Sequence, residues 1–143
     1  MKEEKDANGG AAVRKLIDPR FQQASNWINK QTGDVDWTKC LTFNGARACI
    51  GVEIQMSARS DLIVIDVYHL LDALQKGAVD VAMLVVPDDT LGKYLTDRGP
   101  KFSDAKRHIE RVGADKFPLR VIALQHDGPG EPLAKQFKST QKQ

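Results

Sequence analysis

The sequence has no long hydrophobic run, and this absence narrows the kind of protein that it encodes. It contains no stretch of about 18 consecutive apolar residues, the minimum for an ordinary membrane-spanning helix. The N-terminus begins Met-Lys-Glu-Glu-Lys-Asp, which is charged, whereas a secretion signal would have an apolar core. We therefore expect a cytoplasmic protein that does not associate with membranes.

Cysteines are also few. Cys40 and Cys49 have no further soft ligand near them in the sequence, which argues against a zinc site. In a reducing cytoplasm we expect both thiols to be reduced, although they could also form a cross-strand disulfide in the hairpin described below. A nucleophile elbow, a His-Glu-x-x-His motif, a glycine-rich phosphate loop and a Cys-x-x-Cys pair are likewise missing. These absences remove several common hydrolase and redox chemistries.

The composition is that of one globular domain. The chain has 143 residues, of which 41% are hydrophobic and 28% charged, and this is enough apolar material for a single core. The net charge of +2 neither favours nor excludes a nucleic-acid partner. We expect a disordered N-terminus over 1–10, a single domain over 11–126 and a basic flexible tail over 127–143.

The most informative segment covers residues 33–55 and predicts a β-hairpin. Two β-prone runs flank Asn44-Gly45, a dipeptide that favours a two-residue turn because both turn positions take positive φ. A turn of this length determines the register of the two strands, so Asp36 is expected to lie directly opposite Glu53. Side chains alternate between the faces of a strand, so both carboxylates project from one face at the open end of the hairpin.

This pair of carboxylates suggests a metal site. Asp34 and Gln55 form the next pair on the same face, and like charges directly opposite each other are destabilising. Converging carboxylate oxygens are the ligands that Mg²⁺ or Mn²⁺ takes in proteins. The alternative is that Asp34 and Asp36 start an exposed strand and Glu53 faces solvent. The apolar residues before and after Glu53 favour a central strand and hence a functional acid.

The remaining elements predict the fold class. We expect a helix over Ala11–Lys30 broken at Pro19, a helix over Leu62–Lys76 capped by Asp61, a strand over Val79–Val86, a helix over Ser103–Val112 capped by Ser103, and a strand over Leu119–Gln125. Helices that link the later strands make those strands parallel. The order therefore specifies an α/β fold, a three-layer α/β/α sandwich with a mixed sheet.

Asp36, sixteen intervening residues, and then Glu53-Ile54-Gln55 at the end of a strand resemble the core of the PD-(D/E)xK nucleases. The resemblance is to the branch of restriction-endonuclease-like proteins that contains BamHI and BglII. It implies that Asp36, Glu53 and the backbone carbonyl of Ile54 hold Mg²⁺ (or Mn²⁺). Gln55 stands where most members carry lysine, and it would orient the attacking water. A second departure is that residues 11–30 contain no glutamate, which many relatives place near the metal.

The function implied by this resemblance is that of a divalent-metal-dependent endodeoxyribonuclease. Its partner would be double-stranded DNA, and a homodimer would cut both strands. Basic residues outside the acidic pocket are suited to phosphate contacts, and we expect this role for Arg59, Lys93, Arg98 and Lys101. The same residues also fit an ordinary solvated surface. The alternative function is a catalytically weak or inactive nuclease-fold module for DNA binding or protein assembly, which Gln55 and the short chain favour.

Overall fold

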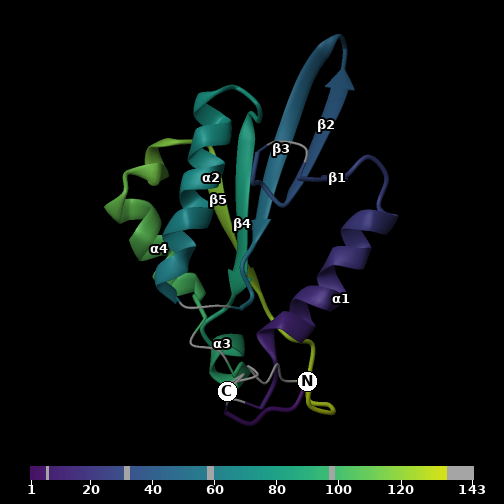
Figure 1. The fold of residues 1–143 in the computed structure, drawn as a ribbon, viewed down its shortest axis with the longest axis vertical. Coiled ribbons are helices and arrows are strands. Elements are labelled where there is room, and N and C mark those ends of the chain that lie inside the picture. The colour runs from purple at the N-terminus through teal and green to yellow at the C-terminus, as the bar shows by residue number, and fades with distance from the viewer. Residues whose placement is uncertain (6, 31–32, 58–59, 97–98, 135–143) are drawn as a thin grey trace, which may run out of the picture.

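The fold is built around one five-stranded mixed sheet (Figure 1). The computed structural model describes residues 1–5, 7–30, 33–57, 60–96 and 99–134. The strands, in spatial order, are β1 (Ile28–Asn29), β2 (Trp37–Phe43), β3 (Ala46–Ile54), β4 (Val81–Pro87) and β5 (Leu119–Leu124). β1 pairs antiparallel with β2 and β2 with β3, whereas β3, β4 and β5 are parallel to one another.

Helices cover both faces of the sheet. They are α1 (Gly10–Gln23), α2 (Ile63–Gln75), α3 (Leu91–Tyr94) and α4 (Phe102–Arg111), with short 3₁₀ turns at Ser60–Leu62 and Ala114–Lys116. In Figure 1, α2 and α4 lie on one side of the sheet and α1 lies on the other. This arrangement confirms the predicted three-layer α/β/α sandwich with a mixed sheet. No helix in the described ranges is long and apolar enough to cross a membrane.

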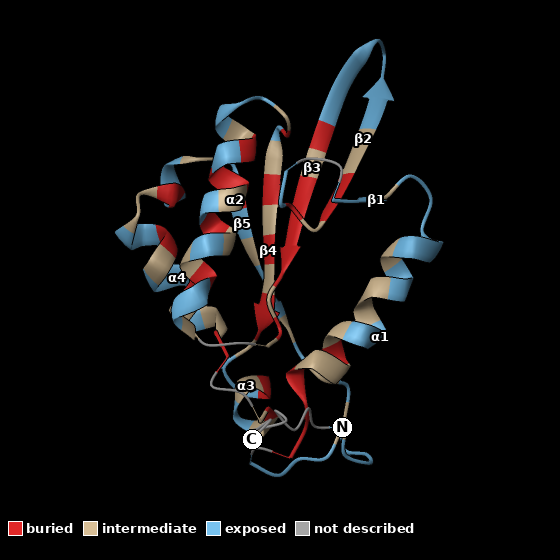
Figure 2. Ribbon diagram, viewed as in Figure 1, coloured by how far each residue is buried: buried red, intermediate tan, exposed pale blue. Residues whose placement is uncertain are grey.

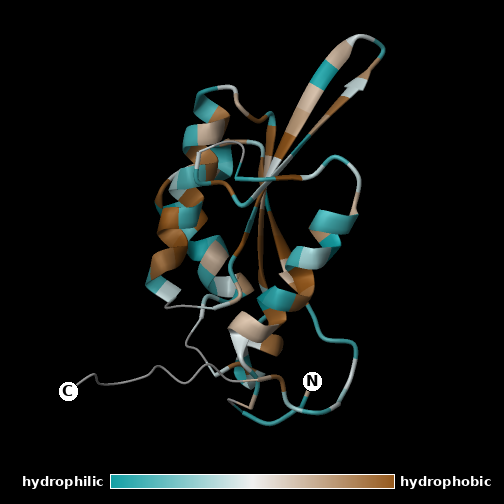
Figure 3. Cartoon of the chain, turned by 45° about the vertical axis from the view of Figure 1, so that its right-hand side comes forward, coloured by the Kyte–Doolittle hydropathy of each residue, from teal (hydrophilic) through white to brown (hydrophobic). Residues whose placement is uncertain are grey.

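The core has two parts, one on each side of the sheet. Alternate residues of β4 contribute to both core parts, since this strand is covered by other elements on both faces and is apolar on both. Leu84 packs with Val67 and Leu70 of α2 on one side, and Val85 packs against the cluster of Val13 and other residues on the other side. Figure 2 shows the buried residues concentrated in the middle of the sheet, and Figure 3 shows the matching apolar strands.

The β2–β3 hairpin has the predicted register. Phe43 pairs with Ala46 across the turn, and Asn44 and Gly45 both have positive φ. The expectation of reduced thiols is wrong, because Cys40 and Cys49 form a disulfide. The register explains this bond: the two cysteines are a directly opposed pair with their Cα atoms 4.0 Å apart.

Helix α1 differs from the expectation. It is continuous across Pro19 and ends at Gln23, whereas two helical pieces reaching residue 30 were predicted. Proline removes one backbone hydrogen bond, but Val13, Ile17 and Phe21 lie at helical spacing and all pack on the sheet, and this packing stabilises the helix through that position. After α1 the chain forms the short edge strand β1 instead of more helix.

Two predicted helix caps are also corrected. The N-cap residue of α2 is Leu62 rather than Asp61, because a 3₁₀ turn precedes the helix. Helix α4 begins one residue early, with Lys101 as its N-cap. Ser103 instead donates through its backbone N–H and its hydroxyl to Asp89. In both cases a tertiary or neighbouring contact changes where the helix begins.

Asn8 near the N-terminus packs on the rest of the domain. Asn8 is fully buried, and its side chain donates to the carbonyls of Lys2 and Tyr94 and accepts from the backbone N–H of Leu133. The expected disorder over 1–10 and the expected flexible tail from residue 127 stay predictions. Residues 135–143, with the remainder of the expected tail, lie outside the described residues.

Candidate metal centre

Two carboxylates meet at the carboxyl end of β3. Asp36 directly precedes β2, and Glu53 is the second-last residue of β3. The last pair of the hairpin ladder is Trp37 with Val52, so one further step along both strands brings Asp36 beside Glu53. Their carboxyl groups share a hydrogen bond. The structure thus brings together the two acids that the hairpin register predicts to be neighbours.

Glu53 is the more deeply buried of the two acids. It is 3% exposed, and its Oε1 lies 3.3 Å from Nδ1 of His69. Burial, then the hydrogen bond with Asp36 and the negative charges of Asp36 and Asp66, raise the pKa of Glu53 to about 10. Without a further cation, Glu53 is therefore protonated at neutral pH. A bound metal ion would displace that proton, because metal ligands bind in their deprotonated form.

Helix α2 contributes two residues that the sequence analysis missed. Each of Asp66, His69 and Glu53 offers one possible ligand atom, and these three atoms lie within 4.8 Å of one another. Asp66 Oδ2 is buried and has no hydrogen-bond partner among the described residues. Burial, followed by repulsion from Asp36, raises the pKa of Asp66 to about 6. The sequence offered one signal for this pair: Asp66 and His69 are three positions apart, so they lie on the same face of a mostly apolar helix.

A surface hollow lies beside His69, the outermost member of this cluster, on the side of α2. It has a volume of about 480 Å³, and its lining includes His69, Tyr68 and Asp34. The Asp34 side chain is 76% exposed, and its Oδ2 lies 3.8 Å from Nε2 of His69. Asp34 therefore lies on the solvent side of His69.

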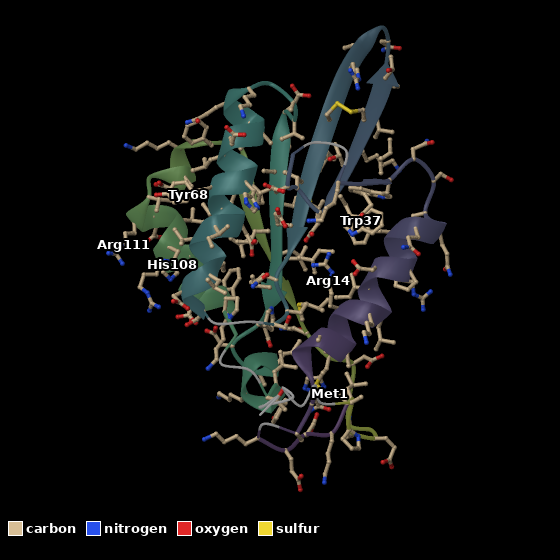
Figure 4. All side chains as sticks on the ribbon, in the orientation of Figure 1. Met1, Arg14, Trp37, Tyr68, His108 and Arg111 are labelled. Atoms are coloured by element: carbon tan, nitrogen blue, oxygen red, sulfur yellow. A yellow bond between two sulfur atoms is a disulfide. The ribbon has the colours of Figure 1, made fainter. Side chains whose placement is uncertain are left out.

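Arg14 of α1 reaches the same strand end from the opposite side of the sheet. Its Nη1 donates to Oδ2 of Asp36 at 3.0 Å and to the carbonyl oxygen of Ile54. Its Nε donates to Oδ1 of Asp18 at 2.7 Å, and the Trp37 indole donates to the same oxygen. Figure 4 shows Arg14 pointing from α1 into the space beside the sheet. No pattern in the sequence pointed to a role for Arg14.

The contacts of Arg14 explain the charge state of Asp36. Burial opposes ionisation, but hydrogen bonds from Arg14, Glu53 and the backbone N–H of Ile54 outweigh it, so the pKa of Asp36 lies below its ordinary value. Burial likewise opposes the charge on Arg14, and its hydrogen bonds to Asp36 and Asp18 raise the pKa of Arg14. The two groups form a charged pair within the site.

The donor set fits a hard divalent cation. Glu53, Asp66 and His69 have ligand atoms within 4.8 Å of one another, and Asp36, which is hydrogen-bonded to Glu53, adds a carboxylate beside this group. Carboxylate oxygens are the ligand type of Mg²⁺ and Mn²⁺. One observation favours a cation there: buried Asp66 Oδ2 lacks a hydrogen-bond partner among the described residues. Burial and the crowding of Glu53 with Asp36 and Asp66 raise the pKa of Glu53, and this crowding points the same way. Arg14 pairs with Asp36 and contacts the Ile54 carbonyl. An ion on those two oxygens would need Arg14 to move.

Gln55 lies directly after β3, on the same strand end. Its backbone N–H donates to the carbonyl of Val85, which continues the pairing with β4 beyond the last residue of the strand. Its side-chain Nε2 donates to the carbonyl of Ser57 at 2.8 Å. This bond fixes the amide at the strand end and leaves its oxygen as a hydrogen-bond acceptor.

Comparison with known proteins identifies one informative relative. No family model matches this chain. The type II restriction enzyme BamHI of Bacillus amyloliquefaciens is 25% identical to it over 125 residues, which cover 80% of this chain and 58% of the enzyme. The chain is similar to a restriction enzyme. It spans little more than half of the length of that enzyme. Together with the mixed α/β sheet, the similarity supports a restriction-endonuclease-like relationship.

The basic residues expected to contact DNA are only partly described. Arg59 and Arg98 lie outside the described residues, as do the tail lysines Lys135, Lys138 and Lys142. Lys93 and Lys101 are described. The side-chain methylene groups of Lys101 pack beside Gly92, the residue before Lys93. Because β3 and β4 are parallel, α3 follows β4 at the same end of the sheet as the acidic pair.

Proposed function

We propose that this chain is a divalent-metal-dependent endodeoxyribonuclease, restriction-endonuclease-like, which hydrolyses phosphodiester bonds of double-stranded DNA. The observation that carries the proposal is the hydrogen-bonded pair of Asp36 and Glu53 beside the Ile54 carbonyl. The similarity to a type II restriction enzyme supports the choice of DNA as substrate. The nuclease domain would comprise residues 11–126.

Each site residue has a proposed role. Asp36, Glu53 and the carbonyl of Ile54 would hold Mg²⁺ or Mn²⁺, and the amide oxygen of Gln55 would accept a hydrogen bond from the attacking water and so orient it. When bound, such an ion supplies Lewis acidity, which favours ionisation of water and offsets phosphate charge. Asp66 adds a buried oxygen beside Glu53.

The proposed DNA contacts lie at the same end of the sheet. Lys93 is exposed on α3, and Lys101 packs beside Gly92 before α4. Arg59 and Arg98 are further proposed contacts. Lysine and arginine bind phosphate oxygens without reading sequence, so these residues would orient the duplex over the acids. Cutting both strands requires two active sites, and we propose that two copies of the chain act together as a homodimer.

A second candidate function is a catalytically weak or inactive module for DNA binding. Two observations favour it. Gln55 is uncharged and its Nε2 is bound to the carbonyl of Ser57, and Arg14 contacts two of the oxygens that a metal ion would take. Both features would reduce turnover without removing the surface lysines.

Metal binding is tested by thermal melting with Mn²⁺ and with EDTA. At a Mn²⁺ concentration about 100 times Kd, mass action raises the stability by about 2.7 kcal/mol, or the melting temperature by about 5–10 °C. Asp36→Asn is expected to abolish this shift. Asp72→Asn is the matched control, because Asp72 is exposed on α2 and pairs with Lys76 instead. A wild-type protein that melts identically in Mn²⁺ and EDTA would contradict the metal site.

Activity is tested by nicking of a supercoiled plasmid with Mg²⁺, Mn²⁺ or EDTA. The wild type is expected to cut only with a metal ion, and Glu53→Ala to abolish cutting while keeping salt-sensitive DNA binding. If both proteins bind DNA equally and neither cuts it, the binding module is the correct function. If neither protein binds DNA at low salt, both proposals are wrong.

A further inference from the structure

The guanidinium group of Arg14 is held at the acidic strand end by oxygens from three parts of the chain. They belong to Asp18 on α1, Asp36 before β2 and the carbonyl of Ile54 on β3. The Arg14 side chain is 23% exposed. Its neighbour Val13 is buried in the core under α1, which positions the helix so that Arg14 points at the sheet.

Two of these oxygens are the ones that the proposed metal ion would take. Mg²⁺ binds its oxygen ligands at about 2.0–2.1 Å. An ion at that distance from both Asp36 Oδ2 and the Ile54 carbonyl would occupy the space between them, where Arg14 Nη1 now lies in contact with both. The ion and the guanidinium nitrogen therefore exclude each other by size as well as by charge.

The rest of the site is arranged around this contact. Asp36 Oδ2 also accepts the backbone N–H of Ile54 at 3.0 Å, so the carboxylate is oriented toward Arg14 by the strand itself. Asp18 lies four residues after Arg14 on the same helix, and its ion pair with Nε fixes the guanidinium plane. These bonds show a preorganised position for a cation, which Arg14 fills.

We propose that Arg14 is a built-in cation that competes with the divalent metal ion for Asp36 and the Ile54 carbonyl, so that the site binds metal only when the guanidinium moves away. This inference rests on the metal site of the proposed function. Arg14 acts on that site as an autoinhibitory contact: it stabilises the metal-free protein and lowers the apparent affinity for the ion. Metal binding and the Arg14 contact are then mutually exclusive states of one site.

The test is calorimetric titration of Mn²⁺ into the wild type, Arg14→Met and Arg20→Met. Methionine keeps the length and the helix preference of the side chain while removing its charge and donors. A hydrogen bond to a charged group contributes about 1.5–3 kcal/mol, so Arg14→Met is expected to bind Mn²⁺ about 10-fold to 100-fold more tightly. Arg20 is an exposed arginine on the same helix. Arg20→Met is the charge-matched control and is expected to bind like the wild type.

A second measurement uses the wild-type protein and does not depend on the stability of the variant. In NMR spectra of the metal-free protein, the Nη signals of Arg14 should be separate, because the guanidinium is held in place. As diamagnetic Mg²⁺ is added these signals should merge, and the midpoint of this change should coincide with the midpoint of Mg²⁺ binding. Signals that stay separate at saturating Mg²⁺ would overturn the competition.

The outcomes separate this inference from the proposed function. Tighter Mn²⁺ binding by Arg14→Met alone, with release of the wild-type guanidinium, supports the competition. Equal binding by all three proteins, or weaker binding by Arg14→Met, overturns it and leaves the metal site intact. If none of the three proteins binds Mn²⁺, the metal site of the proposed function is wrong, and the competition is wrong with it.

Discussion

The buried proton on Glu53 makes a quantitative prediction about stability. In the folded chain the pKa of Glu53 is raised from 4.5 to about 10 by burial and by the negative neighbours Asp36 and Asp66. The folded state therefore holds a proton that the unfolded state releases above about pH 4.5. Its stabilising contribution is complete below that pH and is lost as the pH rises toward about 10.

The magnitude follows from the slope of this linkage. One proton corresponds to about 1.36 kcal/mol per pH unit, so a rise from about pH 6.5 to about pH 8.5 should lower the free energy of unfolding by about 2.7 kcal/mol. Glu53→Gln replaces the protonated acid with a neutral group of the same size and removes this dependence. The variant should match the wild type within about 1 kcal/mol only near pH 4.5, and it should be more stable by about 2.7 kcal/mol near pH 6.5 and about 5.4 kcal/mol near pH 8.5.

The assay is urea denaturation at these pH values in EDTA, followed by comparison of the free energies of unfolding. Taking the difference between wild type and variant cancels the other titrating groups that the two proteins share. Glu110→Gln is the control, because Glu110 is exposed on α4. If the wild type and Glu53→Gln lose stability in parallel, Glu53 is ionised in the folded protein and our reading of the site is wrong.

Three further predictions concern the fold around the site. Reduction of the Cys40–Cys49 disulfide, which spans a sequence separation of 9, should cost up to about 2–3 kcal/mol, seen as a lower melting temperature in dithiothreitol. A Cys40→Ser/Cys49→Ser protein that still responds to dithiothreitol would contradict this cause. Leu84→Ala should cost about 2–5 kcal/mol in urea denaturation, because Leu84 is fully buried, and a cost below about 1 kcal/mol would argue against the described core. One residue inserted between Asn44 and Gly45 should abolish the Mn²⁺ shift in melting temperature by reversing the faces of one strand, and an unchanged shift would mean that the hairpin pairing does not build the site.

Local rules predicted the parts of the fold that depend on neighbouring residues. The Asn44-Gly45 turn and the alternation of side chains were sufficient to place Asp36 beside Glu53, and the observed pairing agrees. The apolar run around Leu84 identified a strand covered on both faces. In each case the interaction that determines the structure lies within a few residues or follows from a period of two.

Local rules failed where packing overrode a local signal. Pro19 is a strong helix breaker, yet three apolar residues of α1 stabilise the helix against the sheet. Local rules also could not predict long-range contacts, such as the hydrogen bond that Asn8 accepts from Leu133, 125 positions away. The expected compartment suggested reduced thiols, whereas the opposed positions of Cys40 and Cys49 lead to a disulfide.

The sequence by itself therefore determined the fold class, the hairpin and the acidic pair of the candidate site. Only the tertiary structure decided what surrounds that pair. Arg14 contacts Asp36, 22 positions away in sequence, and Ile54, 40 positions away. Asp66 and His69 lie on the other side of the sheet because α2 packs there. The physical reason is that strand register follows from a short turn, whereas the rotation and position of a helix on a sheet depend on the whole core beneath it.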